Sequence, residues 1–346
     1  MASGIQTANG KAFEYACVEA IYKSLKDSEN VEIESSPQLI TAKSLYEEAD
    51  EKLKNDLDKA ASAAVRVVKQ LEPQLWNPNG NEPLFLTIQP DSAGIKGDVR
   101  DVVCLRKQNG WEIGFSCKHN HHAVKHSRLS DTIDFGKEWL GIPCSEEYFD
   151  TVVPIFTELR KLRDDSKEAG KPMLWEDLDN KAEKYYKPIL EAFMKELNNI
   201  YEEHKETPAG LIRYLLGRND FYKVITNDKS RITRVEAINI AGTLNSSSGE
   251  EKSITKVPLL KMPSKFYHIG FKPNSDNTVE VVCDEGWQIS MRIHNASSKV
   301  EPSLKFDVQL ISFPSSVYAQ VEPWETLEER SALRIGAYLE AFKSKK

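Results

Sequence analysis

The chain has 346 residues, of which 40% are hydrophobic and 29% are charged. That composition is typical of a folded protein large enough for one big domain or two smaller ones. No run of eighteen apolar residues and no apolar leader is present, so we expect neither a membrane span nor a signal peptide. Five cysteines without CxxC spacing predict buried, reduced thiols in a cytoplasmic protein rather than a disulfide or zinc framework.

The net charge is −7, from 46 Lys+Arg and 53 Asp+Glu residues, and taken alone it argues mildly against nucleic-acid binding. The distribution of the charges matters more than their sum. Residues 146–206 are acidic, whereas 118–128 and 252–305 are locally basic. An acidic total with a basic cleft is compatible with a specific nuclease, because a strongly basic enzyme would hold nonspecific DNA tightly.

Hydrophobic periodicity and turn residues define the predicted elements in chain order. The N-terminal half is expected to form helices over 10–24 and 42–71 and strands over 84–88, 101–106 and 111–117. The middle is expected to be helical over 121–140, 145–163, 175–204 and 208–216. Strands follow over 224–226, 231–240, 266–271, 278–283, 287–294 and 304–312, and a last helix over 327–342. Thr326 is its expected N-cap, with Glu329 completing a capping box.

This order of elements predicts an α+β protein with a mixed N-terminal half, a helical middle and a β-rich C-terminal part. The expected segments are 1–145, 146–220 and 221–346, with one continuous domain as the alternative. No internal repeat is evident.

The two strands over 101–106 and 111–117 are predicted to form a hairpin, because Asn109-Gly110 between them is a strong signal for a two-residue turn. That turn places Val103 opposite Ser116. It also places Asp101 opposite Lys118, on the same face of the pair. The sequence therefore predicts an aspartate beside a lysine at the open end of the hairpin.

An acid–lysine pair of this kind suits phosphodiester hydrolysis. Acidic oxygens bind Mg²⁺, which stabilises charge on the phosphate and activates the attacking water. A neighbouring lysine can orient that water or neutralise developing charge. Asp98 lies one short step beyond Asp101, and a bulge in the strand would favour Asp98 instead. The same pair is also consistent with an ordinary cross-strand ion pair at the surface.

Longer runs of sequence resemble a known family. Residues 97–101, Gly-Asp-Val-Arg-Asp, resemble the acidic motif of restriction endonucleases. Residues 113–130 and 292–307 are similar to the HaeIII family in particular, and the resemblance extends over residues 13–313. It implies a PD-(D/E)xK restriction-endonuclease-like core, a mixed sheet flanked by helices, followed by a helical middle and a β-rich DNA-recognition part. It also implies Mg²⁺ dependence and cleavage of double-stranded DNA within a short palindrome, with GGCC as the expected site.

Under this resemblance, Asp98 and Asp101 match the metal-binding acidic position, and Lys118 matches the catalytic lysine. Glu14 resembles the glutamate in the first helix that supports this type of active site. A solvated helix residue is the alternative interpretation of Glu14. Ser116 stands where the motif normally has a second acid, so this chain departs from the family's usual pattern.

The departure at Ser116 leaves one metal ligand unassigned. Glu112 is a candidate, because it lies on the same strand face as Lys118. Some restriction enzymes with a serine at this position recruit a carboxylate from the next helix, which here would be Asp131 or Asp134. Glu14 is the remaining candidate.

Basic and polar residues outside the hairpin are candidates for DNA contacts. Lys125 and Arg128 follow the hairpin, where phosphate contact and a solvated helix face are both consistent with the pattern. A second group lies in the C-terminal part and combines cations, hydroxyls and an amide, which can grip phosphates and read base edges. This group comprises Arg292, His294, Asn295, Ser297, Ser298 and Lys299.

The sequence therefore favours a Mg²⁺-dependent type II restriction endonuclease. A non-cleaving nucleic-acid-binding protein on the same scaffold is an alternative that the missing motif acid allows. A nuclease acting on structured or damaged DNA is another. Cleavage of a palindrome on both strands favours a symmetric homodimer, although a monomer acting twice would do the same.

Overall fold

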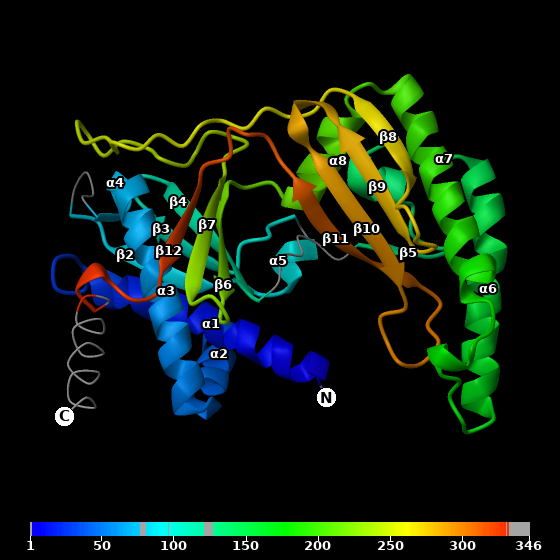
Figure 1. Ribbon diagram of the computed structural model, residues 1–346, viewed down its shortest axis with the longest axis horizontal. Helices are drawn as coiled ribbons and strands as arrows, with labels where there is room; N and C mark the ends of the chain where they lie inside the picture. The colour runs from blue at the N-terminus through cyan, green and yellow to red at the C-terminus, as the bar shows by residue number, and fades with distance from the viewer. Residues whose placement is uncertain (1, 77–80, 96, 121–126, 330, 332–346) are drawn as a thin grey trace, which may run out of the picture. The chain divides into compact units, whose positions relative to one another are not determined.

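The computed structural model describes residues 2–76, 81–95, 97–120, 127–329 and 331. The chain divides into two compact units. The first comprises residues 1–121, 219–259 and 317–346, and the second comprises 122–218 and 260–316. Each unit combines helices with one β-sheet, which confirms the predicted α+β class (Figure 1).

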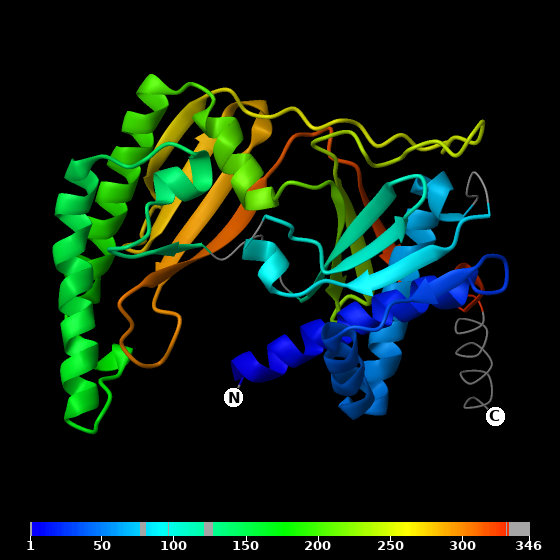
Figure 2. The same ribbon diagram turned by 180° about the vertical axis from the view of Figure 1, so that it is seen from behind.

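The first unit is built on a mixed seven-stranded sheet with the strand order β1-β2-β3-β4-β6-β7-β12. β1 is parallel to β2 and β4 is parallel to β6, whereas the other neighbours are antiparallel. The strands are β1 (Val31–Ile33), β2 (Leu84–Ile88), β3 (Val102–Arg106), β4 (Trp111–His119), β6 (Phe221–Asn227), β7 (Ile232–Ile238) and β12 (Ala319–Pro323). Figure 2 shows the neighbouring strands β2, β3 and β4 with α1 crossing close by.

The helices of the first unit are α1 (Ala2–Leu25), α2 (Pro37–Glu48), α3 (Glu51–Leu71), α4 (Pro73–Trp76) and α5 (Ser92–Ile95). α1 contacts β4 and α3 contacts β7. Phe13, Cys17 and Ile21 recur at helical spacing on α1 and are all buried in the core. The burial of one such side chain contributes about 1.5–3 kcal/mol, so this stripe fixes which face of α1 meets the sheet.

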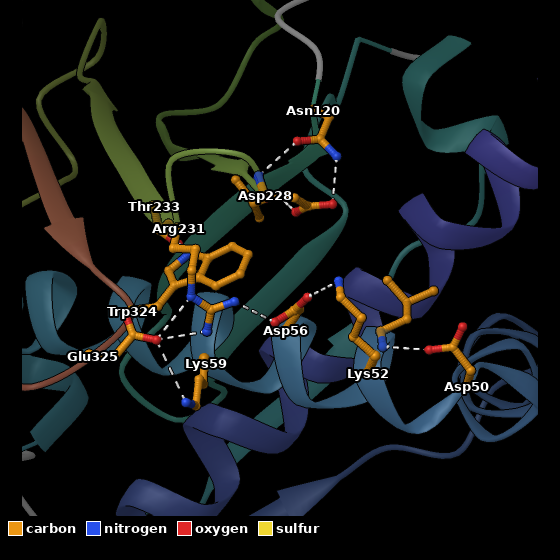
Figure 3. A network of polar contacts seen from close by, with 12 residues as sticks. Asp50, Lys52, Asp56, Lys59, Asn120, Asp228, Arg231, Thr233, Trp324 and Glu325 are labelled. Carbon is orange, nitrogen blue, oxygen red and sulfur yellow. Dashed lines mark hydrogen bonds and ion pairs between the residues drawn. The ribbon is translucent and has the colours of Figure 1, made fainter. Parts of the chain in front are cut away.

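A polar network around Arg231 connects sequence-distant segments of the first unit (Figure 3). The Arg231 guanidinium donates to Asp56 at 2.8 Å and to Glu325 at 2.7 Å. It also lies over the ring of Trp324, 4.8 Å from the ring centroid. The Trp324 indole donates to Thr233 at 3.1 Å. These contacts tie α3 and β7 to the chain just after β12.

The second unit has a five-stranded antiparallel sheet in the order β5-β11-β10-β9-β8. Its strands are β5 (Arg128–Leu129), β8 (Phe266–Phe271), β9 (Thr278–Cys283), β10 (Gln288–His294) and β11 (Leu304–Ser312). Its helices are η1 (Gly136–Leu140), α6 (Glu146–Glu168), η2 (Trp175–Asp177), η3 (Ala182–Tyr186), α7 (Lys187–Glu203), α8 (Thr207–Leu216) and η4 (Asp284–Gly286). One face of this sheet packs on the helices, as the 5.3 Å separation of the Phe193 and Phe306 rings shows.

The two units do not follow the contiguous segments 1–145, 146–220 and 221–346. The parallel pairing of β4 with β6 brings residues 221–227 into the sheet of the N-terminal part. The pairing of β5 with β11 carries residues 128–129 into the other sheet. Both pairings join segments that are distant in the sequence, which local patterns do not reveal.

Several predicted elements are confirmed and others need correction. The strands over 84–88, 266–271, 278–283 and 304–312 have the predicted bounds. The expected helix over 42–71 is two helices, because Asp50 caps a new one by accepting from Leu53 N at 2.8 Å. The expected helix over 121–140 is wrong in its described part, where 128–129 form a strand and only 136–140 are helical.

The sequence also predicted a capping box at Thr326 and a last helix after it. The capping box is confirmed, since Thr326 N donates to Glu329 Oε2 at 2.7 Å and Glu329 N donates to Thr326 Oγ1 at 3.2 Å. Most of the expected helix over 327–342 lies outside the described residues. Among the described helices, none combines the length and the apolar character that a membrane crossing needs.

Candidate active site

The β3–β4 hairpin forms as predicted, but its register differs from the expected one. Four residues, 107–110, separate the paired Arg106 and Trp111, and Val103 faces Gly114. The expectation that Val103 faces Ser116 is therefore wrong by two residues. Side chains alternate along a strand with a period of two, so the slip moves each partner along the strand but keeps it on the predicted face.

Asp101 and Lys118 are nevertheless together at the open end of the hairpin. Asp101 N donates to Phe115 O at 2.7 Å, which holds the residue against β4. Asp101 Oδ2 accepts from Cys117 N at 2.7 Å and lies 3.4 Å from Lys118 Nζ. The predicted juxtaposition is confirmed. Both side chains keep some exposure, 23% for Asp101 and 17% for Lys118, so a substrate can reach them.

Glu14 brings a second carboxylate to this end of the hairpin from α1. Its side chain is buried, and Lys11 Nζ lies 3.3 Å from its Oε2. Burial, and after it the negative charge of Asp101, raise the pKa of Glu14 from 4.5 to about 8. The interpretation of Glu14 as a solvated helix residue is therefore wrong. The two acids lie close enough to repel each other.

Two neighbouring carboxylates of this kind fit a divalent cation. Within the described part of the chain, no three His, Cys, Asp or Glu side chains gather into a metal site by themselves. Mg²⁺ does not need such a cage, because it is usually held by one or two carboxylates and completes its shell with water and substrate oxygens. A cation bound by these carboxylates would also offset the repulsion from Asp101, which adds to the effect of burial in raising the pKa of Glu14.

The carboxylate of Asp98 is engaged with other side chains. It accepts from Arg100 Nε at 2.8 Å, from the second guanidinium nitrogen at 2.7 Å and from Gln89 Nε2 at 2.7 Å. Burial opposes ionisation, but these donors, Arg100 above all, hold the pKa of Asp98 below its usual value. Asp98 is thus a partner of Arg100 in this structure. Asp101 is the acid that faces the lysine.

Glu112 lies at the other end of β4 from Lys118. It precedes Lys118 by six residues on the same strand, which corresponds to about 20 Å. Its carboxylate is half exposed and pairs with Arg100 at 2.9 Å.

Asp131 and Asp134 belong to the second unit and have local partners. The Asp131 carboxylate pairs with Arg160 at 2.6 Å. Asp134 accepts from Lys137 N at 2.9 Å and from Cys144 N at 3.0 Å. The expectation that they lie in a helix following the hairpin is wrong, because η1 begins only at Gly136.

One charged residue beside Ser116 was missed by the sequence analysis. β6 runs parallel to β4, and Lys223 is the register partner of Ser116. Both residues are buried. The only local signal is a lysine inside the apolar run 221–225. Its relation to the hairpin depends on a strand pairing between distant segments.

The second unit carries several of the predicted DNA-binding residues on one sheet face. Register pairs Arg128 with Lys305, Lys305 with His294, and Arg292 with Asp307. These side chains share the face opposite Phe306, which packs on the helices. Arg292 is 56% exposed and pairs with Asp307 at 3.2 Å. The open face therefore gathers cations, including Lys305, which the sequence analysis had not selected.

The loop after β10 is held by its own polar residues. Asn295 Nδ2 donates to Ser297 O at 2.5 Å and to Lys299 O at 2.7 Å, and Asn295 is buried. Ser297 Oγ accepts from Lys299 N at 3.0 Å. Ser298, Ser297 and Lys299 are exposed, so they remain accessible to a ligand, whereas Asn295 shapes the loop. Lys125 lies outside the described residues.

A mixed sheet flanked by helices, with an acid and a lysine at the end of a central hairpin and a glutamate from the first helix, defines a nuclease of the restriction-endonuclease-like class. Comparisons with known proteins give the particular family. The family model described as HaeIII restriction endonuclease matches residues 10–314. The chain is 39% identical over 318 residues to the type II restriction enzyme HaeIII of Haemophilus aegyptius, covering 92% of this chain and 98% of that protein.

This chain belongs to the HaeIII restriction endonuclease family and is a type II restriction endonuclease. No solved structure matches it.

Proposed function

We propose that the protein hydrolyses phosphodiester bonds in double-stranded DNA at a short palindrome, expected to be GGCC, with Mg²⁺ as cofactor. The single observation that supports this most is the cluster of Glu14, Asp101 and Lys118 at the open end of the hairpin. Two carboxylates and an ammonium group in one partly exposed place are what this reaction requires. Membership of the HaeIII family supports the expected target sequence.

In this proposal Asp101 and Glu14 hold the divalent ion. When bound, the ion supplies Lewis-acid stabilisation of the charge that develops on the phosphate. Lys118 orients the attacking water and neutralises charge on the phosphate, for which its ammonium group beside Asp101 is well placed. Water adds to phosphorus, one P–O ester bond breaks, and the leaving oxygen takes up a proton. Ser116 keeps the motif position small and uncharged.

DNA binding is assigned in this proposal to the open face of the second sheet. Arg128, Arg292, His294 and Lys305 supply positive charge there, and the exposed Ser297, Ser298 and Lys299 add hydrogen-bonding groups. Cations, hydroxyls and amides of this kind can contact phosphate oxygens and base edges. A cytoplasmic homodimer would match the symmetry of a palindromic site in the cell's DNA.

The test is digestion of long duplex DNA in millimolar Mg²⁺ by the wild type and by Lys118→Ala. Discrete fragments from the wild type, and none from the variant, are expected. Short duplexes with GGCC or with one base pair changed would then show whether that site is required. Fragments without a common sequence would favour a nuclease for structured or damaged DNA. Tight binding with intact DNA in both Mg²⁺ and Mn²⁺ would favour a non-cleaving binding protein and contradict the proposal.

A further inference from the structure

Three basic residues stand side by side on the open face of the second sheet. Antiparallel pairing places Lys305 of β11 between Arg128 of β5 and His294 of β10. Directly opposed residues on adjacent strands project from the same face, so the three side chains form one row across the sheet. Arg128 is exposed, and the other two are half-buried. The row is therefore accessible to a ligand.

Acidic side chains do not neutralise this row. Within the part of the chain that the structure describes, none of the three residues forms an ion pair with a carboxylate. Arg128 donates to the neutral hydroxyl of Ser303 at 3.0 Å. His294 Nδ1 lies 2.9 Å from the backbone oxygen of Asn295. Two permanent cations, Arg128 and Lys305, are thus register partners without an acid between them.

Such an arrangement is unfavourable for the fold itself. Like charges directly opposite each other destabilise an antiparallel pair of strands. Burial, and after it the charge of Arg128, lower the pKa of Lys305, whereas Asp307 opposes this effect. The two cations therefore act on each other, and a bound anion would offset their repulsion.

The next rows on the same face contain acids. Arg292 faces Asp307 across β10 and β11, and their side chains form an ion pair at 3.2 Å. Ser290, two residues before Arg292, faces Glu280 of β9. Both carboxylates would repel a phosphate. Positive charge without a compensating acid is therefore concentrated in the row on β5, β11 and β10.

We propose that Arg128 and Lys305, with His294 beside them, form a phosphate-binding site that anchors the DNA backbone irrespective of base sequence. Asp307 keeps Arg292 out of this role by forming an ion pair with it. The ligand class is a phosphodiester of duplex DNA, and the His294 ring adds a donor when it is protonated. Phosphate contacts position a protein on DNA and carry no sequence information directly. This inference rests on the proposed nuclease function and divides the roles within its DNA-binding face.

The experiment compares the wild type with Lys305→Met, Arg128→Met, Asp307→Asn and the control Lys195→Met. Lys195 lies on α7 and pairs with Glu147, so its replacement removes a charge from the same unit outside the sheet. Binding to a GGCC duplex and to a duplex with that site altered is measured without a divalent ion, at a series of salt concentrations. Urea denaturation gives the free energy of unfolding of each protein.

Lys305→Met and Arg128→Met should each weaken binding to both duplexes by the same factor, about tenfold. Each should also reduce the slope of log affinity against log salt concentration by about one. Lys305→Met should be at least as stable as the wild type, because it removes a like-charge repulsion. Asp307→Asn should increase the salt slope, since it frees Arg292 to contact phosphate. Lys195→Met should leave affinity and slope unchanged.

Unchanged salt slopes in Lys305→Met and Arg128→Met, with a wild type that cleaves DNA at discrete sites, would overturn this inference and leave the nuclease function intact. A loss of affinity for the GGCC duplex alone would also overturn it, because it would show contacts to bases. If Lys305→Met loses stability, Arg128→Met decides the question, because Arg128 is exposed. A wild type that neither binds nor cleaves duplex DNA would refute the proposed function, and this inference with it.

Discussion

Arg106 and Lys223 are both buried cations next to the β3–β4 hairpin, one at its closed end and one beside its open end, and their surroundings differ. Arg106 is fully buried, and its guanidinium donates to Gln74 O, Glu82 O and Leu75 O as well as to the carboxylate of Glu29. Lys223 has surroundings that lower its pKa. The hydrogen bonds of Arg106 are thus satisfied at the closed end of the hairpin, whereas burial disfavours the charged form of Lys223.

Burial raises the pKa of the acid at each end, but the two acids have different charged neighbours. Glu29 pairs with Arg106 at 2.7 Å. At the open end, Glu14 is buried near Asp101, which repels it, and its pKa is raised to about 8. Removing a charge should therefore harm stability at the closed end and cleavage at the open end.

The largest effect is expected for Lys118→Ala. The change removes the ammonium group 3.4 Å from Asp101 and should lower the cleavage rate about a thousandfold. Stability should change little, because Lys118 is partly exposed and the Cys117 N donor still holds Asp101. Single-turnover kinetics and chemical denaturation measure the two quantities. Normal cleavage by Lys118→Ala would show that the charges at the open end of the hairpin are not needed for cleavage.

Arg106→Met should have the opposite profile. It leaves the buried carboxylate of Glu29 and three carbonyl oxygens without their donor, so the free energy of unfolding should fall by about 3–5 kcal/mol. Molecules that remain folded at low temperature should cleave at the wild-type rate. The exposed neighbour Lys107→Met serves as control and should change stability by less than about 0.5 kcal/mol. Wild-type stability of Arg106→Met would contradict the claim that the buried charge at the closed end stabilises the fold.

Glu72 is a further buried acid, and its titration should make the stability of the protein depend on pH. It is fully buried and accepts from Tyr222 OH and Asn245 N, both at 2.6 Å. Burial raises its pKa from 4.5 to about 7, so the folded state holds the proton more tightly than the unfolded state. The free energy of unfolding should therefore fall as pH rises from 4.5 to 7.

Glu72→Gln does not titrate and should lose this dependence. Relative to the wild type, it should gain on the order of 2 kcal/mol between pH 5 and pH 8. Urea denaturation of both proteins across this range measures the difference. Parallel curves for the two proteins would show that Glu72 does not titrate in this window.

Gly114→Ala should be destabilising by about 1–3 kcal/mol. A Cβ atom at Gly114 would lie 2.2 Å from Arg100 Cδ, so the Arg100 side chain would have to leave its ion pairs with Asp98 and Glu112. Gly10→Ala is the matched control on α1, where a Cβ meets nothing within 4 Å, and it should be neutral or stabilising. Thermal or chemical denaturation measures the stability of both variants. Equal losses of stability would show that the clash with Arg100 is not the cause.

The smallest effect is expected for Glu112→Gln. The carboxylate is half exposed and its pair with Arg100 contributes at most about 1 kcal/mol. Because Glu112 is distant from Lys118 along β4, the cleavage rate and its Mg²⁺ dependence should be unchanged. A raised Mg²⁺ requirement of Glu112→Gln would indicate instead that Glu112 is a metal ligand.

The local chemistry of the sequence predicted the hairpin and the pairing of Asp101 with Lys118, but not the register. Glu82 accepts from Gln108 N, and Asn109 Oδ1 accepts from Trp111 N at 2.8 Å, so the turn has four residues instead of two. Glu82 belongs to a distant segment. The predicted side-chain faces are still correct, because the register is shifted by an even number of residues.

Residues that act across sequence-distant pairings could not be predicted in this way. Lys223 meets Ser116 only through the parallel pairing of β4 with β6. Asp98 was a candidate metal ligand by spacing, and only the positions of Arg100 and Gln89 reveal how it is engaged. Short-range patterns predicted where the strands of the hairpin lie, whereas the length of its turn and the charge partners depend on the assembled sheet.

The most direct test of the account measures both cleavage and stability of Asp101→Asn. The amide oxygen can still accept from Cys117 N, and the change removes the negative charge that repels Glu14. We predict a variant with no detectable cleavage in Mg²⁺ and a free energy of unfolding equal to or above that of the wild type. A variant that cleaves normally, or one that is inactive only because it is unfolded, would contradict the account.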